Sequence, residues 1–403
     1  MSLSILWLGR TLPLPLNSGD RIYSARLVGA VARAGARVTY LGLQNPDEKM
    51  GELGVLEPGV RWQLVPGEPR NRLIALLSPL PLVGARFATA SYRQALAREL
   101  TDGVHDVIVF DQYALSWALE DVRHLARNRP LLVHLAHDFE TEVTAQISRN
   151  FRGNPVRKVL LTRNAAKTRL AEQALAQRCD LLASLTDHDS AAFASINPRL
   201  QTIVLPPGYS GPRQRVRLLD AAVPRRVIIV GSFSWIAKQM NLRRFLEAAS
   251  LPFAQHGIEI RVVGFVPESV KPGMRARFPE VTFCGVVEDL SEEFKQARLA
   301  LVPEETGGGF KLKTLDYIFA RVPVAALAPA LNGISDQLRS QFLVAENLRS
   351  LVARIVEAVD DIAHLNDMQN GAFSLAENLF DWEANGRAFM RSVETAVAGM
   401  GVT

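Results

Sequence analysis

A glycine-rich stretch followed by two lysines is the part of the sequence best suited to bind an anion. The glycines at 307–309 follow an apolar run that ends at Pro303, and Lys311 and Lys313 come directly after them. A helix predicted to begin near Phe310 would point its first backbone NH groups at a ligand such as phosphate. Cations in a first helical turn oppose the helix dipole unless an anion compensates them. The stretch therefore predicts a phosphate site; the alternative is a tight turn with exposed lysines.

Two predicted strands of the first half are also followed by polar residues. The loop LNSGDR, residues 16–21, follows the apolar run 4–8, and its glycine would let the backbone approach a ligand closely. His137 follows a strand predicted over residues 131–135. A lone histidine is more often structural, but the carboxyl end of a parallel strand is where α/β proteins bind ligands. We therefore favour a functional role for His137.

Asp187, His188 and Asp189 form a D-x-D pattern, which in another fold could hold a divalent metal through its two carboxylates. The pattern follows an apolar run at 181–185 and precedes a helical segment. At such a place Thr186 or Asp187 makes an ordinary helix cap. We favour the cap and expect no essential metal.

The elements that must position these residues form two series. With 403 residues the chain is too long for one core, since single cores stop growing at about 250–300 residues. Apolar runs at 4–8, 37–43, 107–110, 131–135 and 181–185 alternate with helical segments, as in a doubly wound parallel sheet. After a stretch rich in Pro, Gly and Arg at 206–226, the same alternation restarts.

We therefore predict an α/β fold with two Rossmann-like domains. The first covers residues 1–206 and the second residues 207–377. Residues 378–403 include an amphipathic helix, which we expect to return to the first domain.

Composition narrows the class of protein and of partner. A chain that is 48% hydrophobic and 22% charged is typical of a soluble globular protein. Its two cysteines, Cys179 and Cys284, lie far apart, and no apolar run approaches the ~18 residues of a spanning helix. We expect a cytoplasmic protein. The net charge of +5 favours anionic partners such as nucleotides, nucleic acid or an acidic membrane surface. Nucleic acid is the weakest of the three, because the sequence has no zinc-knuckle, RNA-recognition or basic-zipper pattern.

The segment 70–98 mixes bulky apolar residues with five arginines and no acid. A helix of this composition can lie on an anionic membrane, with its arginines among the headgroups. The alternative is an ordinary helix pair that faces the core. We favour this alternative slightly because Pro79 and Pro81 interrupt any long amphipathic stripe.

The glycine-rich stretch resembles the retaining glycosyltransferases of family 4, in particular the subgroup that makes bacterial cell-surface polysaccharides. Members carry a Gly-Gly-Gly-x-[KR]-x-K-x-x-[ED] pattern, which here is GGGFKLKTLD at 307–316, followed by Pro323 and Val324. Upstream, IIVGSFSWIAK at 228–238 and VTFCGVVEDL at 281–290 also resemble the family. LPLPLNSGDR at 12–21 and VHLAHDFETEV at 133–143 are looser matches. The resemblance covers most of the second domain.

The resemblance implies a GT-B fold, in which the two domains face each other across a cleft, and it implies roles for residues. The donor-binding residues would be Gly19, Gly231, Ser232, Lys238, Val286, Gly307, Gly308, Gly309, Phe310, Lys311, Lys313 and Asp316. The acceptor-binding residues would be Asn17, Ser18, Asp20, Arg21, Asp111, Asp138 and Glu140. The catalytic residues would be His137, Lys238 and Asp316.

The implied reaction moves a hexose from a nucleoside-diphosphate sugar to a hydroxyl acceptor, with retention of configuration. The nucleotide sugar is a co-substrate, and neither a metal nor another cofactor is needed. The acceptor would be a glycan or a lipid-linked molecule, and the enzyme would lie in the cytoplasm, at the inner face of the cytoplasmic membrane if the segment 70–98 contacts it.

Two departures from the family keep alternatives open. Asp316 is shorter than the usual glutamate, and Arg321 replaces the usual glycine before Pro-Val. Glu304 or Glu305 could supply the carboxylate that Gly308 replaces. The alternatives are a sugar-nucleotide 2-epimerase of the same fold and a partner protein that binds nucleotide sugars without turnover.

Overall fold

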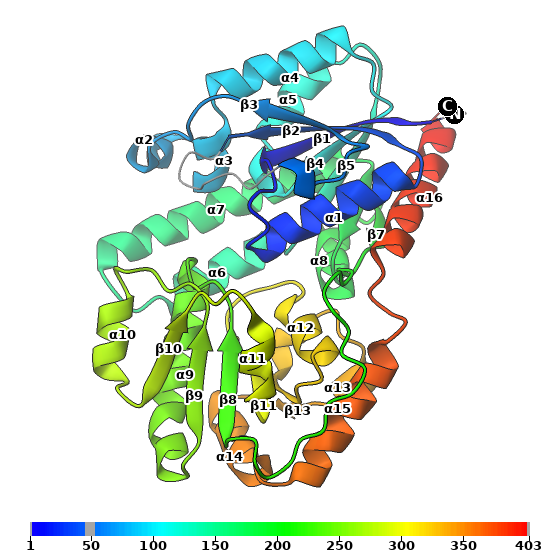
Figure 1. Ribbon diagram of the computed structural model, residues 1–403. Helices are drawn as coiled ribbons and strands as arrows, with labels where there is room; N and C mark the ends of the chain where they lie inside the picture. The colour runs from blue at the N-terminus through cyan, green and yellow to red at the C-terminus, as the bar shows by residue number, and fades with distance from the viewer. Residues whose placement is uncertain (1, 45–52, 401–403) are drawn as a thin grey trace. The chain divides into compact units, whose positions relative to one another are not determined.

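The computed structural model describes residues 2–44 and 53–400 (Figure 1). The chain divides into two compact units. Unit 1 comprises Met1–Gly208 and Asp381–Thr403, and unit 2 comprises Tyr209–Phe380. The boundaries expected from the sequence lay at residues 206 and 377. No helix in the described ranges is long and apolar enough to cross a membrane.

Unit 1 is built on a parallel sheet whose strands, in its described part, follow the order β3-β2-β1-β4-β5-β6-β7. The strand order reverses direction between β1 and β4, which makes this a switch point of a doubly wound sheet. The strands are β1 (Ser4–Thr11), β2 (Arg37–Leu43), β3 (Arg61–Val65), β4 (Val107–Asp111), β5 (Leu131–Ala136), β6 (Leu181–Ser184) and β7 (Gln201–Val204).

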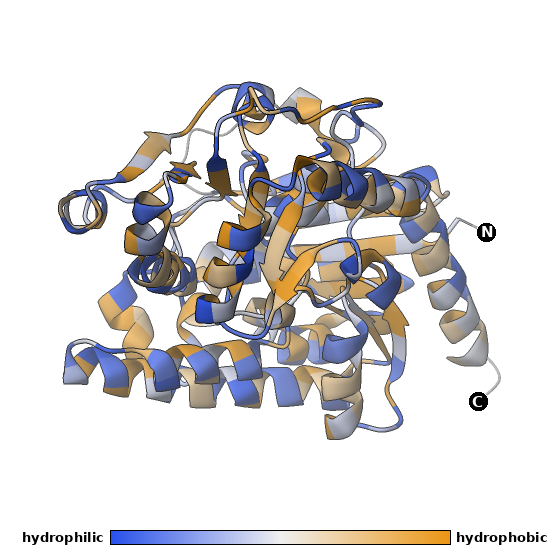
Figure 2. Cartoon of the chain, turned by 90° about the horizontal axis from the view of Figure 1, so that it is seen from below, coloured by the Kyte–Doolittle hydropathy of each residue, from blue (hydrophilic) through white to orange (hydrophobic). Residues whose placement is uncertain are grey.

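Helices connect these strands and cover the sheet. They are α1 (Gly19–Arg33), α2 (Arg72–Leu77), α3 (Leu82–Phe87), α4 (Ala90–Asp102), α5 (Ala118–Leu125), α6 (Glu140–Asn150), α7 (Pro155–Arg178), α8 (Asp187–Ile196) and α16 (Trp382–Met400), with short 3₁₀ turns η1 (Leu53–Val55) and η2 (Tyr113–Leu115). Central strands such as β4 are buried along their whole length, and Figure 2 shows the strands mostly in the hydrophobic colour.

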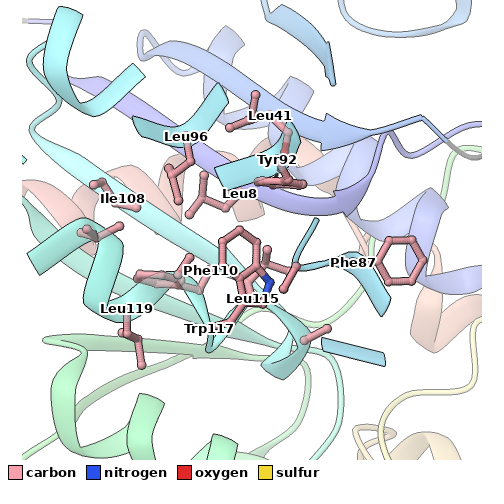
Figure 3. Packing of buried hydrophobic residues seen from close by; sticks show 14 of the residues in the cluster. Leu8, Leu41, Phe87, Tyr92, Leu96, Ile108, Phe110, Leu115, Trp117 and Leu119 are labelled. Atoms are coloured by element: carbon pink, nitrogen blue, oxygen red, sulfur yellow. Dashed lines mark hydrogen bonds between the residues drawn. The ribbon is translucent and has the colours of Figure 1, made fainter. Parts of the chain in front are cut away.

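The core of unit 1 lies between the sheet and the helices that cover one of its faces. Figure 3 shows Tyr92, Leu96 and Trp117 gathered against Leu8 and Phe110 of the strands. The buried Tyr92 hydroxyl donates a hydrogen bond to strand carbonyls, at 2.8 Å from the oxygen of residue 9 and 2.8 Å from that of residue 41. Its polar atom is therefore satisfied inside an apolar layer.

The C-terminal helix α16 returns to unit 1, as predicted, and packs on α1. Gly386 lies so close to the backbone of Ala30 that a Cβ atom there would collide with it. Arg33 donates to Glu383 at 2.9 Å, and the ring of Trp382 meets that of Tyr23 edge-on at 5.4 Å. The last helix in the sequence therefore completes unit 1.

Unit 2 has a second parallel sheet, with the order β10-β9-β8-β11-β12-β13. Its strands are β8 (Arg226–Val230), β9 (Glu259–Val263), β10 (Val281–Gly285), β11 (Leu299–Val302), β12 (Val324–Leu327) and β13 (Leu343–Ala345). Its helices are α9 (Ile236–Gln255), α10 (Lys271–Arg277), α11 (Leu290–Lys295), α12 (Lys313–Phe319), α13 (Asp336–Arg339), α14 (Leu348–Ala358) and α15 (Ile362–Ala376), with a 3₁₀ turn η3 (Ala328–Ala330). The prediction of two Rossmann-like domains is confirmed.

The irregular stretch 206–226 contains the junction between the units, but most of it is bound to unit 2. The Arg217 guanidinium donates to the carbonyl oxygens of Arg321, Phe294 and Ala297 at 2.6–2.9 Å. The ring of Tyr209 stacks on Phe319 with centroids 4.4 Å apart. The segment therefore has a composition typical of a flexible linker, but its side chains bind to the rest of unit 2.

Candidate functional site

The glycine-rich loop joins β11 to α12 at the carboxyl edge of the unit 2 sheet. The helix α12 begins at Lys313, so the prediction of a helix start near Phe310 is wrong. Gly307 and Gly309 have φ values of 131° and 61°, which disfavour other residues. These angles hold the loop out of helical geometry up to the start of α12.

A buried asparagine on α9 holds this loop in place. The Asn241 side-chain oxygen accepts a hydrogen bond from the Thr306 NH at 3.0 Å, and its amide nitrogen donates to the Thr306 carbonyl at 2.6 Å. One side chain thus satisfies both backbone groups of a buried residue. The sequence interpretation missed Asn241, for which the only signal is a polar residue on the core side of a helix.

Both lysines of the motif have partners within the protein. Lys313 forms a close ion pair with Glu304, and the two side chains are largely buried. Lys311 donates to the carbonyls of Gly308 and Gly309. The premise that these cations need an external anion is wrong for Lys313, because Glu304 compensates it. Glu305 pairs with Arg244 of α9 at 2.9 Å.

Asp316 and Arg321 lie at opposite ends of α12. Asp316 is half-buried in the first turn, and burial raises its pKa to about 7. Arg321 ends the helix with a φ of 53°, a conformation that favours glycine. Its side chain donates to the Gln214 carbonyl at 2.9 Å and to Asn370 at 2.7 Å. The substitution at 321 therefore changes the helix end rather than the glycine-rich loop.

The ends of three neighbouring strands of unit 2 carry exposed apolar side chains. Trp235 follows β8, Phe265 follows β9, and Val286 follows β10. Gly231 and Ser232 lie directly after β8. Exposed apolar groups at a strand edge form a surface on which a flat ring can pack. The sequence interpretation missed Phe265.

Lys238 lies in the first turn of α9, which begins at Ile236 directly after this surface. The residues predicted to bind a donor in unit 2 thus follow β8, β10 and β11 at one edge of the sheet. They are Gly231, Ser232, Lys238, Val286, Gly307, Gly308, Gly309, Phe310, Lys311, Lys313 and Asp316. Phe310 is an exception in character, because its ring is buried and packs against Phe380. Gly19 belongs to unit 1, where it is the first residue of α1.

In unit 1, His137 is held by a carboxylate from the neighbouring strand. Its Nε2 atom lies 2.9 Å from Asp111 Oδ1, and the other oxygen of Asp111 accepts a hydrogen bond from Trp7 at 3.0 Å. Its Nδ1 atom lies 3.2 Å from the side-chain Nε2 atom of Gln112. Burial lowers the pKa of His137, but Asp111 outweighs this effect and the pKa is raised. The imidazole therefore lies between a carboxylate and a side-chain amide.

The loop before α1 is organised by an arginine that the sequence interpretation did not single out. Arg10 donates to Asp20 at 2.8 Å, and the Ser18 hydroxyl donates to the same carboxylate at 2.5 Å. Burial would raise the pKa of Asp20, but Arg10 and Ser18 hold it at about 2. Arg21 donates to Asn17 at 3.3 Å. Asp20 is thus an ionised, anchored carboxylate.

These residues surround a hollow at the switch point between β1 and β4. Its lining comprises Arg10, Thr11, Pro13, Asp20, Arg21, Ser24, Tyr40, Asp111 and Gln112. Gln112 has a φ of 77°, a strained value for a residue other than glycine. The hollow therefore brings Asp20 and Arg21 beside Asp111, whereas Asp138 and Glu140 are not among its lining residues.

The turn that follows His137 is clamped by two buried carboxylates. Glu172 of α7 accepts the NH groups of Glu140 and Thr141 at 2.9 and 2.7 Å. Asp189 of α8 accepts the NH of Phe139 at 3.0 Å. Burial raises the pKa of Glu172 to about 7. The sequence interpretation missed Glu172, whose signal is an acid on the buried side of a long helix.

Asp138 and Glu140 belong to this turn. Burial raises the pKa of Glu140, and the neighbouring acids Asp138 and Glu172 raise it further. Glu140 Oε2 is buried and has no hydrogen-bond partner among the residues that the structure describes. A protonated carboxyl group can donate a hydrogen bond as well as accept one.

The D-x-D pattern caps a helix, as predicted. Thr186 is the N-cap of α8 and accepts the NH of Asp189 at 3.1 Å. Asp187 is exposed, whereas Asp189 is buried and accepts the NH of Phe139. Within the described part of the chain, no three His, Cys, Asp or Glu residues gather as metal ligands would.

Known families and solved structures that resemble the chain bear on its fold. Residues 224–361 match the family described as "Glycosyl transferases group 1". The matched range contains the glycine-rich loop, Asn241 and Lys238. The matched range lies within unit 2. No curated protein sequence matches the chain.

Solved structures with similar folds cover nearly the whole chain. A sucrose-phosphate synthase from Thermosynechococcus elongatus is 17% identical, with a TM-score of 0.70 over 98% of this chain and 100% of that one. WaaG, a glycosyltransferase involved in lipopolysaccharide biosynthesis, is 18% identical, with a TM-score of 0.66 over 97% and 99%. HepE from Anabaena, in complex with UDP-glucose, is 15% identical, with a TM-score of 0.65 over 98% and 100%. The chain therefore has the GT-B fold.

Proposed function

We propose that this protein transfers a hexose from a nucleoside-diphosphate sugar to a hydroxyl acceptor, with retention of configuration. The observation that carries the proposal is the loop at 303–312. Asn241 holds it at a strand edge, and it lies within the range that matches glycosyl transferases. HepE, which has a similar fold, binds UDP-glucose. We propose a donor of the same class, with its nucleotide base left open.

The donor diphosphate would bind at the glycine-rich loop. Lys311 and Lys313 would exchange their present partners, the loop carbonyls and Glu304, for phosphate oxygens. Lys238 would add a third cation from α9. These charges would stabilise the leaving diphosphate electrostatically, which needs no covalent step and no metal ion. The surface formed by Trp235, Phe265 and Val286, together with residue 231 and its neighbours, would hold the base.

The acceptor hydroxyl would bind in unit 1. The His137–Asp111 pair would present an imidazole to the acceptor, and the hollow lined by Arg10, Asp20 and Arg21 supplies hydrogen-bonding groups beside Asp111. The departing phosphate would take the acceptor's proton on the face at which the new bond forms. Asn17, Ser18, Asp138 and Glu140 would shape this acceptor site.

The acceptor would be a glycan or a lipid-linked molecule in the synthesis of a cell-surface polysaccharide or glycoconjugate. The supporting observation is the likeness in fold to WaaG. A cytoplasmic location beside the membrane agrees with this proposal. The epimerase alternative gains no support from the fold or from the comparisons.

A partner protein without turnover remains the second candidate, because Asp316 is half-buried and burial raises its pKa to about 7. A neutral carboxyl group contacts ribose hydroxyls differently from an ionised one. Measurement of nucleotide binding together with nucleotide-sugar hydrolysis separates the candidates. A transferase binds and slowly hydrolyses its donor, whereas a partner protein binds without hydrolysis.

Thermal unfolding in the presence of UDP, GDP and ADP is the first experiment. A ligand present at one hundred times its dissociation constant adds about 2.7 kcal/mol to the free energy of unfolding. At least one nucleotide should raise the unfolding temperature by several degrees. No shift with any of the three would contradict the proposed function.

A further inference from the structure

Unit 1 exposes a face on which aliphatic side chains lie among cations. We call it the α2–α7 face. Six aliphatic side chains of this face have exposed fractions between 38% and 89%: Leu73, Ile74, Leu77, Val156, Val159 and Leu160. Surface helices normally turn such residues toward a core. On α2 and on the first turns of α7, these aliphatic side chains instead face outward. An exposed apolar surface of this kind is typical of a contact with another surface.

The two helices of this face are joined by hydrogen bonds. Lys167 of α7 donates to the carbonyls of Leu76 and Ser78 at the end of α2, at 3.1 and 2.5 Å. Asn164 of α7 accepts the NH of Leu82 at 2.7 Å. In Figure 1, α2 and the first turns of α7 lie on the left side of unit 1. The exposed aliphatic side chains therefore lie on two helices that contact each other.

The exposed charges on α2 and on the first turns of α7 are positive. From residue 143 to residue 171 the sequence contains no acid, and α2 is preceded by Arg70 and begins with Arg72. The cations over that range are Arg149, Arg152, Arg157, Lys158, Arg163, Lys167 and Arg169. Several of them, such as Arg157 and Lys158, are exposed beside the aliphatic stripe. The face is therefore complementary to an anionic surface.

We propose that the α2–α7 face binds the surface of an anionic lipid bilayer. Aliphatic groups enter the headgroup boundary while cations contact the lipid phosphates, and a bilayer satisfies both at once. A nucleic acid would engage the cations but leave the aliphatic side chains in water. The proposal names a partner and does not depend on the transfer reaction.

This assignment differs from the one expected from residues 70–98 alone. The residues of α3 and α4 in that segment supply Phe87, Tyr92 and Leu96 to the core of unit 1. Arg93 forms a close ion pair with Asp121. Only α2 of that segment remains exposed in the way a membrane contact requires, and α7 supplies the rest.

Vesicle sedimentation tests the proposal with the full chain. The vesicles contain phosphatidylcholine alone or phosphatidylcholine with phosphatidylglycerol. The wild-type protein should sediment with the anionic vesicles, roughly tenfold more than with the neutral ones, and the bound fraction should fall as salt rises. Equal sedimentation with the two vesicle types, or with neither, would overturn the proposal.

Two double variants test the two parts of the face. Val156→Ser with Val159→Ser removes aliphatic contact, and Arg157→Glu with Lys158→Glu reverses charge. Each should lower partitioning onto anionic vesicles roughly tenfold or more. The matched control is Arg123→Glu with Arg127→Glu, at exposed positions elsewhere on unit 1. The control should bind nearly as the wild type does, and an equal loss in the control would overturn the proposal.

Two further measurements keep the test specific. Circular dichroism and unfolding temperature show whether each variant folds; a folded variant that still binds anionic vesicles as the wild type does would overturn the assignment. Binding to an RNA oligonucleotide without binding to vesicles would overturn it as well. So would a dimer that dissociates in the Val156 and Val159 variant while vesicle binding is absent. Nucleotide affinity, measured separately, reports on the proposed function.

Discussion

Replacement of Glu172 by glutamine tests how the turn after His137 is held. The Glu172 carboxylate accepts two backbone NH groups, and the side chain is 1% exposed. Glutamine has the same shape, but its amide nitrogen cannot accept a hydrogen bond. One NH group would then face a donor, which we expect to cost about 1–3 kcal/mol in the free energy of unfolding.

The pH dependence of this effect has a definite sign. Burial raises the pKa of Glu172 from its ordinary value of 4.5 to about 7, so the folded state binds the proton more tightly than the unfolded state does. Stability from this group is fully present below pH 4.5 and is lost as pH rises through 7. The difference between the two pKa values corresponds to at most about 3 kcal/mol. Glutamine does not titrate, so the variant should lack this loss.

Urea unfolding of the wild type and Glu172→Gln at pH 5 and pH 8 measures this effect. Tryptophan fluorescence follows mainly unit 1, which contains Trp7, Trp62, Trp117 and Trp382 but not Trp235. The variant should lose stability relative to the wild type at pH 5 and regain some or all of the difference at pH 8. Glu120→Gln, at an exposed position on α5, is the control. The same difference at both pH values would refute the reasoning.

Two further predictions concern the other anchors of the sites. Asn241→Ala leaves the Thr306 NH and carbonyl unpaired, so it should lower the free energy of unfolding by about 1–3 kcal/mol and weaken nucleotide binding. An unchanged nucleotide affinity in calorimetric titration would argue that Asn241 does not hold the glycine-rich loop in its binding geometry. The pKa of Asp20 is lowered from 3.8 to about 2, so its carboxylate stabilises the folded state above pH 4, and this stabilisation is lost as pH falls through 2. Asp20→Asn should remove this contribution. The variant should be less stable by at most about 2 kcal/mol at pH 7 and by less at pH 3 in urea unfolding; an equal loss at both would contradict the role of Arg10.

The strands could be predicted from the sequence because parallel strands buried on both faces are continuous apolar runs. The runs at 107–110, 131–135 and 181–185 fall within or overlap β4, β5 and β6. Strand order then brings His137 and Asp111 together, since the carboxyl ends of β4 and β5 are neighbours. The class of the fold and the edge that carries the site follow from these runs.

The contacts that organise the sites could not be predicted in this way. The start of α12 depends on backbone angles at Gly307 and Gly309, which no periodicity reveals. Glu304 forms an ion pair with Lys313 across a loop, and Asn241 binds Thr306, which lies 65 residues away in sequence. Such pairs depend on three-dimensional packing, and the residue types alone admit many partners.

Calorimetric titration of nucleoside diphosphates into the wild type, Lys311→Ala, Lys313→Ala and His137→Ala tests the central claim most directly. Each lost charged hydrogen bond should cost about 1.5–3 kcal/mol, roughly ten- to a hundredfold in affinity for the two lysine variants. Glu304→Gln, the matched control, releases Lys313 from its ion pair and should bind at least as tightly as the wild type. His137→Ala should keep nucleotide affinity within a few fold while turnover falls. Wild-type affinity in both lysine variants would contradict the diphosphate site, and with it the proposed transfer.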